Sequence, residues 1–352
     1  MESFWNRLPK PFFAMAPMAD VTDPAWRALV ARLGSPRSSS GEAGKPDVMF
    51  TEFVSADGLY HTREREPNVR HRKSYIPDER SPLMRDLQFS EAERPIVAQF
   101  FSAKPEMVAY AATLAEELGF DGVDVNMGCP DRTIEHQGAG AMLIKTPELA
   151  QELIRAAQEA SPLPVSVKTR IGYNAEMLDE WLPALLEARP AAITLHLRTR
   201  KEMSLVPADW GLMKRAVELR DRLAPPQARR APEVLMIGNG DVRDLDEARA
   251  KIAETGCDGV MIGRGMFGNP WVFNPGAIAD LNAKDLRLRK LEALVELAHS
   301  FEALTPPKHF AILKKHIKAF VIGFDGAAEL RASLMQAENA NELERLILER
   351  RP

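Results

Sequence analysis

The chain has 352 residues, and its 46 Lys and Arg residues against 50 Asp and Glu residues give a formal net charge of −4. Hydrophobic residues make up 45% and charged residues 27% of the sequence, which excludes a disordered chain, a collagen and a disulfide scaffold. The weakly acidic charge argues against a protein that coats nucleic acid by bulk charge, although it leaves room for a local basic patch.

The cysteine content and the hydropathy pattern bear on location. Only Cys129 and Cys257 are present, so we expect no disulfide framework and a reducing, cytoplasmic environment. No apolar run reaches the roughly 18 residues that a membrane span needs. The apolar stretch after Lys10 is interrupted by prolines and predicts a first buried strand rather than a signal peptide.

Short apolar segments alternate with amphipathic segments over most of the chain. The amphipathic segments, such as 105–119 and 146–160, begin with acidic residues and are rich in Ala, Leu and Glu, as helices are. Eight strand–helix units predict a closed (β/α)₈ TIM barrel, an α/β fold with a parallel sheet. The predicted strands are 11–16, 47–53, 95–100, 122–127, 164–169, 191–197, 233–239 and 259–264.

The alternation stops near residue 280. Only helical patterns follow it, so we predict a barrel domain over 1–280 and a C-terminal all-helical domain over 281–352. Two connections, 34–47 and 224–232, have the composition of surface insertions.

Polar residues cluster at the predicted strand ends. In a (β/α)₈ barrel the active site lies at the carboxyl ends of the strands. Six consecutive strands deliver polar groups to that rim, which packing alone does not readily explain. These residues are Gln99, Asn126, Lys168, Arg170, His196, Arg198, Asn239, Asp241 and Arg264.

The turns after the last two predicted strands, 238–241 and 263–265, are rich in glycine. We expect each to open a helix and to bind phosphate through backbone N–H groups, although both could be simple tight turns. Residues 263–268 also match Gly-x-Gly-x-x-Gly. We reject a Rossmann unit because the match follows the eighth strand and no acidic residue ends a later strand about 20 residues on.

A phosphate site beside a lysine and a histidine suits FMN, because a lysine near the pyrimidine edge of a flavin can stabilise its reduced form. Structural alternatives remain open for each residue. Lys168 could form an ion pair at the barrel mouth, and His196 could be a hydrogen-bonded core residue. Gln99 and Asn126 could satisfy backbone groups.

The two cysteines are expected on opposite rims. Cys129 lies in a turn between Gly128 and Pro130, just after a predicted strand. With an ordinary pKa of about 8.5 its thiol would be mostly neutral and able to donate a proton, although a buried structural thiol is the commoner role. Cys257 precedes the eighth strand and is expected to pack. This separation predicts no metal site.

These motifs together resemble the tRNA-dihydrouridine synthases. The resemblance extends in the right order over nearly the whole chain, and residues 126–145 are the most diagnostic part. The resembling segments are 16–27, 97–100, 123–149, 167–174, 196–200, 207–210, 237–242, 256–273 and 313–331.

The resemblance implies an FMN-bound barrel, a helical tRNA-binding domain and a monomer. NADPH would reduce the flavin, hydride would pass to C6 of a uracil, and Cys129 would protonate C5 to give 5,6-dihydrouridine in tRNA. Asn126, Arg170 and Arg198 would contact the substrate. The implied FMN contacts are Pro17, Met18, Ala19, Gln99, Lys168, His196, Asn239, Gly240, Asp241, Gly263 and Arg264.

Two basic clusters could bind the tRNA backbone, namely 61–73 with an excess of three positive charges and 308–318 with four lysines and no acid. On charge alone, each could equally be a solvated face. Two other functions remain open: a flavin barrel acting on a free pyrimidine, as dihydroorotate and dihydropyrimidine dehydrogenases do, and a non-catalytic RNA-binding protein. The motifs do not encode which uridine is modified.

Overall fold

The computed structural model describes residues 3–34, 44–64, 81–224 and 234–350. Within them, nine parallel strands form one sheet in the order β1-β9-β8-β7-β6-β5-β4-β2, and β3 also pairs with β4. The strands are β1 (Phe12–Met15), β2 (Met49–Phe50), β3 (Val54–Ser55), β4 (Ile96–Phe101), β5 (Gly122–Met127), β6 (Val165–Arg170), β7 (Ala192–His196), β8 (Leu235–Asn239) and β9 (Gly259–Ile262).

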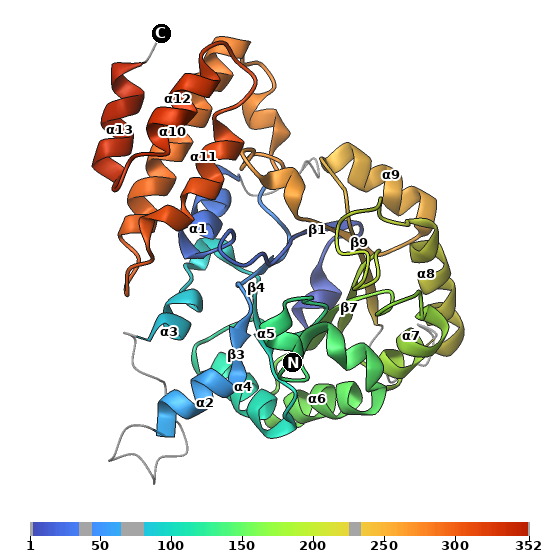
Figure 1. Cartoon of the computed structure of the whole chain (residues 1–352). Coiled ribbons are helices and arrows are strands. Elements are labelled where there is room, and N and C mark those ends of the chain that lie inside the picture. The colour runs from blue at the N-terminus through green and yellow to red at the C-terminus, as the bar shows by residue number, and fades with distance from the viewer. Residues whose placement is uncertain (1–2, 35–43, 65–80, 225–233, 351–352) are drawn as a thin grey trace.

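The sheet closes on itself. A ladder joins β1 to β9, with Phe12 opposite Gly259. On the other side of β1, the Met15 N–H donates to the carbonyl of Val48 at 2.9 Å, next to a parallel bridge between Ala14 and Val48. Helices surround this closed sheet (Figure 1). The predicted (β/α)₈ barrel is therefore confirmed.

The second predicted strand, 47–53, is wrong in its extent. The structure has two short strands there, β2 and β3, and residues between them leave the sheet. The Gln99 N–H on β4 donates to the side-chain Oγ1 of Thr51 at 3.0 Å rather than to a backbone carbonyl. A side chain thus replaces a backbone acceptor in the ladder, and the strand breaks at this point.

The barrel helices are α1 (Pro24–Leu33), α2 (Ala56–Glu64), α3 (Pro82–Asp86), α4 (Pro105–Glu117), α5 (Arg132–Glu135), α6 (Pro147–Ala160), α7 (Leu178–Glu187), α8 (Gly211–Leu223) and α9 (Leu245–Thr255). Four of the barrel helices, α1, α3, α5 and α9, begin at a residue whose side chain caps the first turn. Asp23 accepts a hydrogen bond from the Trp26 N–H at 3.0 Å, and Pro24 occupies the first position of α1. Short 3₁₀ turns are η1 (Phe4–Arg7), η2 (Glu91–Glu93), η3 (Gly140–Lys145), η4 (Arg264–Met266), η5 (Pro275–Ile278) and η6 (Phe310–Ile312).

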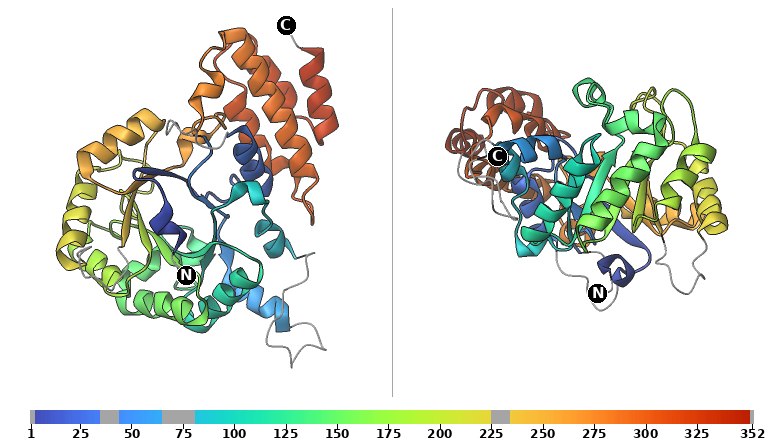
Figure 2. Two further views of the ribbon diagram at one scale, coloured as in Figure 1. Left: turned by 180° about the vertical axis from the view of Figure 1, so that it is seen from behind. Right: turned by 90° about the horizontal axis from the view of Figure 1, so that it is seen from below.

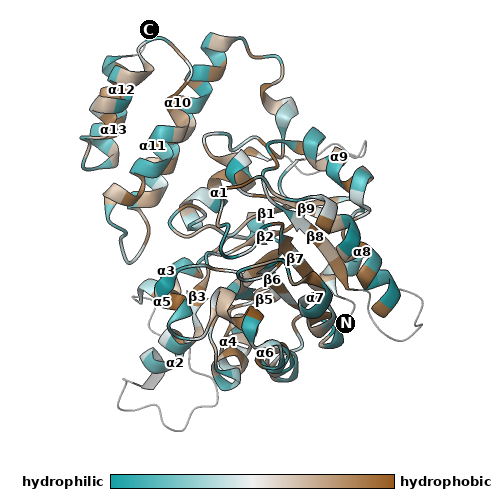
Figure 3. Cartoon of the chain, turned by 45° about the vertical axis from the view of Figure 1, so that its right-hand side comes forward, coloured by the Kyte–Doolittle hydropathy of each residue, from teal (hydrophilic) through white to brown (hydrophobic). Residues whose placement is uncertain are grey.

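The strands are buried on both faces, as expected when helices cover a parallel sheet. All residues of β4, β5 and β8 are buried, and Figure 3 shows the strands as a hydrophobic centre among helices with hydrophilic outer faces. Polar side chains such as Gln99, Asp124 and Ser166 are buried on these strands and bond to one another. Polar groups inside the barrel are thereby satisfied.

The C-terminal helices are α10 (Ala283–Glu302), α11 (Lys314–Phe320), α12 (Ala327–Leu334) and α13 (Ala340–Glu349). They pack beside α1 at one side of the barrel (Figures 1 and 2). Trp26 of α1 stacks on His316 of α11 with ring centroids 4.6 Å apart. We propose that residues 281–352 form the predicted helical domain. None of the described helices is long and apolar enough to cross a membrane.

Three sequence predictions fall largely outside the described residues. These are the insertion at 34–47, the insertion at 224–232 and the basic cluster at 61–73.

Candidate active site

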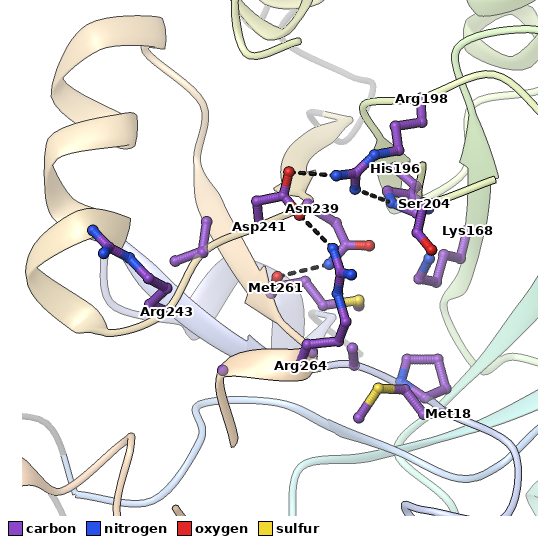
Figure 4. A pocket seen from close by; sticks show the side chains of 16 residues that line it. Met18, Lys168, His196, Arg198, Ser204, Asn239, Asp241, Arg243, Met261 and Arg264 are labelled. Carbon is purple, nitrogen blue, oxygen red and sulfur yellow. Dashed lines mark hydrogen bonds and ion pairs between the residues drawn. The ribbon is translucent and has the colours of Figure 1, made fainter. Parts of the chain in front are cut away.

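A cavity of about 570 Å³ opens where β1, β6, β7, β8 and β9 end. This is the rim that strand–helix alternation predicts for a barrel active site. Figure 4 shows how its side chains converge. The lining residues are Ala16, Pro17, Met18, Lys168, His196, Arg198, Ser204, Asn239, Gly240, Asp241, Val242, Arg243, Met261, Gly263, Arg264 and Gly265.

Asp241 organises one end of the cavity. Its carboxylate is paired with both Arg198 and Arg264 (Figure 4), and it also accepts from the Ala208 N–H at 2.8 Å. Partial burial opposes ionisation of Asp241, but the hydrogen bonds from Arg198 and Ala208 outweigh it and lower its pKa. The carboxylate therefore fixes two guanidinium groups at the cavity wall.

The charge of the cavity favours an anionic ligand. Lys168, Arg198 and Arg264 stand against the single carboxylate of Asp241, which leaves an excess of two positive charges. Arg243 also lines the cavity, but its guanidinium pairs with Glu247 on α9. Such an excess in a recessed site attracts phosphate.

The glycines at this end bring two loops together. Gly240 has a φ of +136°, and a Cβ there would lie 2.7 Å from Ala208 Cβ. A Cβ at Gly265 would lie 2.6 Å from the Arg243 carbonyl oxygen. Only glycine lets these backbones approach one another and the cavity.

The expectation that each glycine turn opens a helix is wrong. After β9 the chain makes only the three-residue 3₁₀ turn η4. After β8, helix α9 begins at Leu245, and its cap Asp244 already accepts from the Glu247 N–H. Because Gly265 packs against the backbone at Val242 and Arg243, the loops pack on each other instead of continuing into helices. The positive charge at this end of the cavity therefore comes from side chains and not from a helix end.

Lys168 and His196 lie on neighbouring strands. Burial and the charge of Arg170 lower the pKa of Lys168 to about 8. Burial and the positive charge of Lys168 lower the pKa of His196 well below its usual range. Arg198 Nη1 lies 3.2 Å from His196 Nε2, and since a guanidinium only donates, Nε2 must accept. His196 is thus neutral, with its proton on Nδ1.

A buried hydrogen-bonded chain leads from the barrel interior to Cys129. Ser166 Oγ donates to Asp124 at 2.6 Å, and Gln99 Nε2 donates to the other Asp124 oxygen at 2.7 Å. Asn126 Nδ2 donates to Gln99 Oε1 at 3.0 Å, and Asn126 Oδ1 accepts from the Cys129 N–H at 2.9 Å. The backbone of the cysteine turn is thereby tied to the interior of β4, β5 and β6.

Cys129 itself is partly buried and packs against the small apolar cluster of Phe101, Ile134 and Ala139. Burial raises the pKa of its thiol, so the thiol is protonated near neutral pH. The predicted separation of the cysteines holds, because Cys257 is buried just before β9 at the other end of the barrel. Among the described residues no cluster of His, Cys, Asp or Glu could hold a metal ion.

Five of the predicted site residues do not line the cavity. Gln99, Asn126 and Cys129 belong to the buried chain just described. Arg170 donates to the backbone carbonyls of Gly128, Thr199 and Met203 and so holds the surrounding loops. Ala19 lines a separate cavity of about 340 Å³, beside Glu52 and Lys308. The main chain turns away from the first cavity after Met18, which a linear motif does not reveal.

Sequence reasoning missed several residues of the site. The inward-facing alternation of β5 places Asp124 on the same side as Asn126, so this signal was available. Gly265 stands in the glycine turn already singled out. Ser204 comes from the long connection after β7, and no sequence signal places it in the cavity. The other missed lining residues are Ala16, Val242, Arg243 and Met261.

The chain is similar to known proteins over nearly its whole length. A family model described as dihydrouridine synthase matches residues 14–350. A probable tRNA-dihydrouridine synthase 2 of Bacillus subtilis is 38% identical over 98% of this chain and 96% of its own length. A probable tRNA-dihydrouridine synthase of Staphylococcus epidermidis is also 38% identical, over 98% of this chain and 95% of its own length.

A solved structure of a 2-naphthoyl-CoA reductase complex shares the fold at a TM-score of 0.51, with 9% identity over 76% of this chain and 50% of that one. At that identity the likeness concerns the fold alone. The near-complete family match, together with full-length relatives at 38% identity, settles the classification: this chain belongs to the dihydrouridine synthase family of oxidoreductases.

Proposed function

We propose that the chain is an FMN-dependent enzyme that uses NADPH to reduce uridines in tRNA to 5,6-dihydrouridine. The observation that carries the proposal is the cavity at the strand ends, where Lys168, Arg198 and Arg264 outnumber a single carboxylate. At Gly240 and Gly265 two loops pack closely on each other, so a ribityl phosphate at this end of the cavity would be held mainly by the guanidinium groups. The names of the full-length relatives support tRNA as the substrate.

The proposed cofactor residues fall into two groups. Asn239, Gly240, Asp241, Gly263 and Arg264 would hold the phosphate end, and Pro17, Met18, Lys168 and His196 would face the ring system. We assign Gln99 and Ala19 no direct cofactor contact, because Gln99 bonds to Asp124 and Asn126 and Ala19 lines another cavity. When bound by these residues, FMN would supply the hydride that the reduction of the uracil at C6 requires.

The chain's own residues supply the rest of the chemistry. Lys168, when protonated, stabilises negative charge at the cavity floor. Neutral His196 can donate from Nδ1, because Nε2 is occupied by Arg198. Cys129 donates its proton to C5: the S–H bond breaks, the C5–H bond forms, and water reprotonates the thiolate. A raised pKa keeps that proton on the sulfur until the reaction requires it.

The substrate residues are reassigned in part. Asn126 remains within reach of the cysteine turn, and we propose that it contacts the base. Arg170 and Arg198 act by positioning, since Arg170 holds three backbone carbonyls and Arg198 holds His196 and Asp241.

A uridine in folded tRNA must leave its stack to reach this cavity. The C-terminal helices would hold the tRNA, but cluster 308–318 is less available than its charge indicates. Lys308 is 4% exposed and pairs with Glu52 and Asp86, and Lys315 pairs with Asp20. Lys318 is exposed on α11 and can reach solvent. A monomer in the cytoplasm remains the expectation.

The test begins with the purified protein. It should carry flavin absorbance, and with NADPH it should convert uridine to dihydrouridine in unmodified tRNA. Free uracil at equal nucleotide concentration is the control. Equal turnover of free uracil would indicate a small-pyrimidine enzyme, and tight tRNA binding without redox activity would indicate a binding protein. Protein that stays colourless when FMN is added would refute the proposal.

A further inference from the structure

The connection between β7 and α8 exposes three apolar side chains next to the cavity. Met203, Leu205 and Val206 are 40%, 86% and 40% exposed. Ser204, which stands among them, lines the cavity and lies beside His196 and Lys168 in Figure 4. The other strongly exposed large apolar side chains of the described residues are Leu223, Ile322 and Leu348, which are far apart in the sequence. We call residues 203–206 the apolar tip.

The apolar tip is held in a fixed conformation. Arg170 Nη1 donates to the Met203 carbonyl at 3.0 Å, and Arg198 Nε donates to the Val206 carbonyl at 2.5 Å. Both arginines are buried. Between these anchors, the Leu205 N–H donates to the Glu202 carbonyl at 2.9 Å.

Met203 has a φ of +57°, a left-handed conformation that a non-glycine residue adopts only when its surroundings impose it. The tip is therefore organised before any ligand arrives, so contact with it costs little ordering entropy.

Single exposed apolar side chains are ordinary, but a rigid cluster at the mouth of a site marks a contact surface. Resting on the proposed function, we propose that the apolar tip packs against the tRNA bases next to the extruded uridine, with Leu205 as its leading contact. Extruding a base leaves an apolar gap between its former neighbours, and proteins that unstack bases fill such gaps with apolar side chains.

The size and charge of this surface fit RNA better than a second copy of the chain. A stable dimer needs about 800 Å² of buried surface per partner, which three side chains do not provide, whereas the face of one base needs far less. Lys201, two residues before Met203, is also exposed. Its ammonium can contact a backbone phosphate beside the unstacked base.

The experiment compares Leu205→Ser with Leu223→Ser. Leu223 is 47% exposed and ends α8, and because α8 runs back along the barrel, it lies at the rim opposite the cavity. Leu205→Ser should lower kcat/KM for tRNA about tenfold, equivalent to about 1.4 kcal/mol. Flavin absorbance and flavin reduction by NADPH should not change. Leu223→Ser should behave as the wild type, and Leu205→Met should restore most of the tRNA turnover.

The outcomes separate this inference from the proposed function. Wild-type protein that fails to reduce tRNA removes the proposed function before any variant is compared. Wild-type protein that reduces tRNA, together with Leu205→Ser within twofold of it, overturns the apolar tip alone. A wild-type dimer that Leu205→Ser converts to a monomer in light scattering also overturns it, because the tip would then serve self-association.

Discussion

The position of the Cys129 thiol is set by neighbouring residues that hold its backbone. Its sulfur is partly buried, and its backbone is held by Asn126 at the end of the buried chain through Gln99 and Asp124. Gly140, with a φ of +63°, lets the following loop approach, since a Cβ there would lie 2.7 Å from the Cys129 carbonyl oxygen. The cysteine turn is thus held in place by residues from β4, β5 and one loop.

Cys129→Ala should retain flavin and its reduction by NADPH but lose tRNA turnover by at least about 100-fold, the usual contribution of a positioned general acid. Stopped-flow absorbance measures the first step and dihydrouridine content the second. Cys257→Ala is the matched control, because Cys257 is buried at the opposite rim. Full tRNA turnover in Cys129→Ala would remove the thiol from the mechanism.

The dependence of tRNA turnover on pH should reflect the protonation of the Lys168 ammonium. Its pKa is lowered to about 8, so tRNA turnover should fall as the pH rises through about 8 and the ammonium loses its proton. The negative charge of Asp124 raises the pKa of Lys168. Asp124→Asn should therefore move the alkaline limb to lower pH.

The asparagine can keep the interior hydrogen bonds. Its Oδ1 can accept from Gln99 while its Nδ2 donates to Ser166, whose hydroxyl can turn to the Val123 carbonyl 3.4 Å away. A limb that stays in place in Asp124→Asn would show that Lys168 does not produce it. Thr169→Val is the control, because it removes a buried hydroxyl that bonds to Trp181 and not to Asp124. It should leave the alkaline limb of the pH profile unchanged.

At the scale of elements, the strand ends and the connections that follow them together form the cavity, and the connections also join the barrel to the C-terminal segment. Neither glycine turn opens a helix directly, and the break between β2 and β3 leaves Glu52 free to reach the C-terminal segment. Lys308, just before η6, places its ammonium 2.6 Å from Glu52 and 3.3 Å from Asp86. This ion pair joins a barrel connection to the helical segment.

Lys308→Met should lower the free energy of unfolding by roughly 3 kcal/mol, because it leaves the 6% exposed carboxylate of Glu52 without its partner. Urea denaturation measures the loss. Lys315→Met is the control: its pair with Asp20 is about half exposed on both sides, so its loss should cost less than about 1 kcal/mol. Equal losses in both variants would contradict a special role for the buried pair.

At the scale of the whole molecule, one continuous core joins the barrel to the C-terminal helices. His316 of α11 is 2% exposed and lies between Trp26 of α1, at 4.6 Å, and Phe267 after η4, at 5.7 Å. Burial lowers the pKa of His316 to about 4. Protonating this ring would place a charge inside the junction between the two parts.

Stability should therefore fall in acid. Because the unfolded chain binds this proton with a pKa near 6.5 and the folded chain only near 4, stability is full above about pH 6.5 and declines as the pH falls to about 4. The loss from this group is roughly 3 kcal/mol. His316→Phe should flatten this part of the pH–stability curve, measured by thermal unfolding. An unaltered curve in His316→Phe would contradict the assignment.

The closed barrel and the rim at which the polar residues meet follow from the pattern of the amino-acid sequence. Local patterns suffice for these features, because parallel strands all deliver their carboxyl ends to one edge and the amphipathic helices present an apolar face to the sheet. The separation of Cys129 from Cys257 follows from the same alternation. A net charge of −4 likewise did not preclude a cavity with an excess of positive charge.

Which of the polar residues at the strand ends line one cavity depends on long-range packing. Arg170 and Gln99 stand at strand ends like Lys168, yet their side chains bond to neighbouring loops and to Asp124 instead of lining the cavity. In the sequence, Lys308 is indistinguishable from the other lysines of the cluster 308–318, but in the folded chain it is buried against Glu52. Partners distant in the chain set these outcomes, because a buried polar group is costly without a hydrogen bond and the local sequence does not supply the partners of Gln99, Arg170 and Lys308.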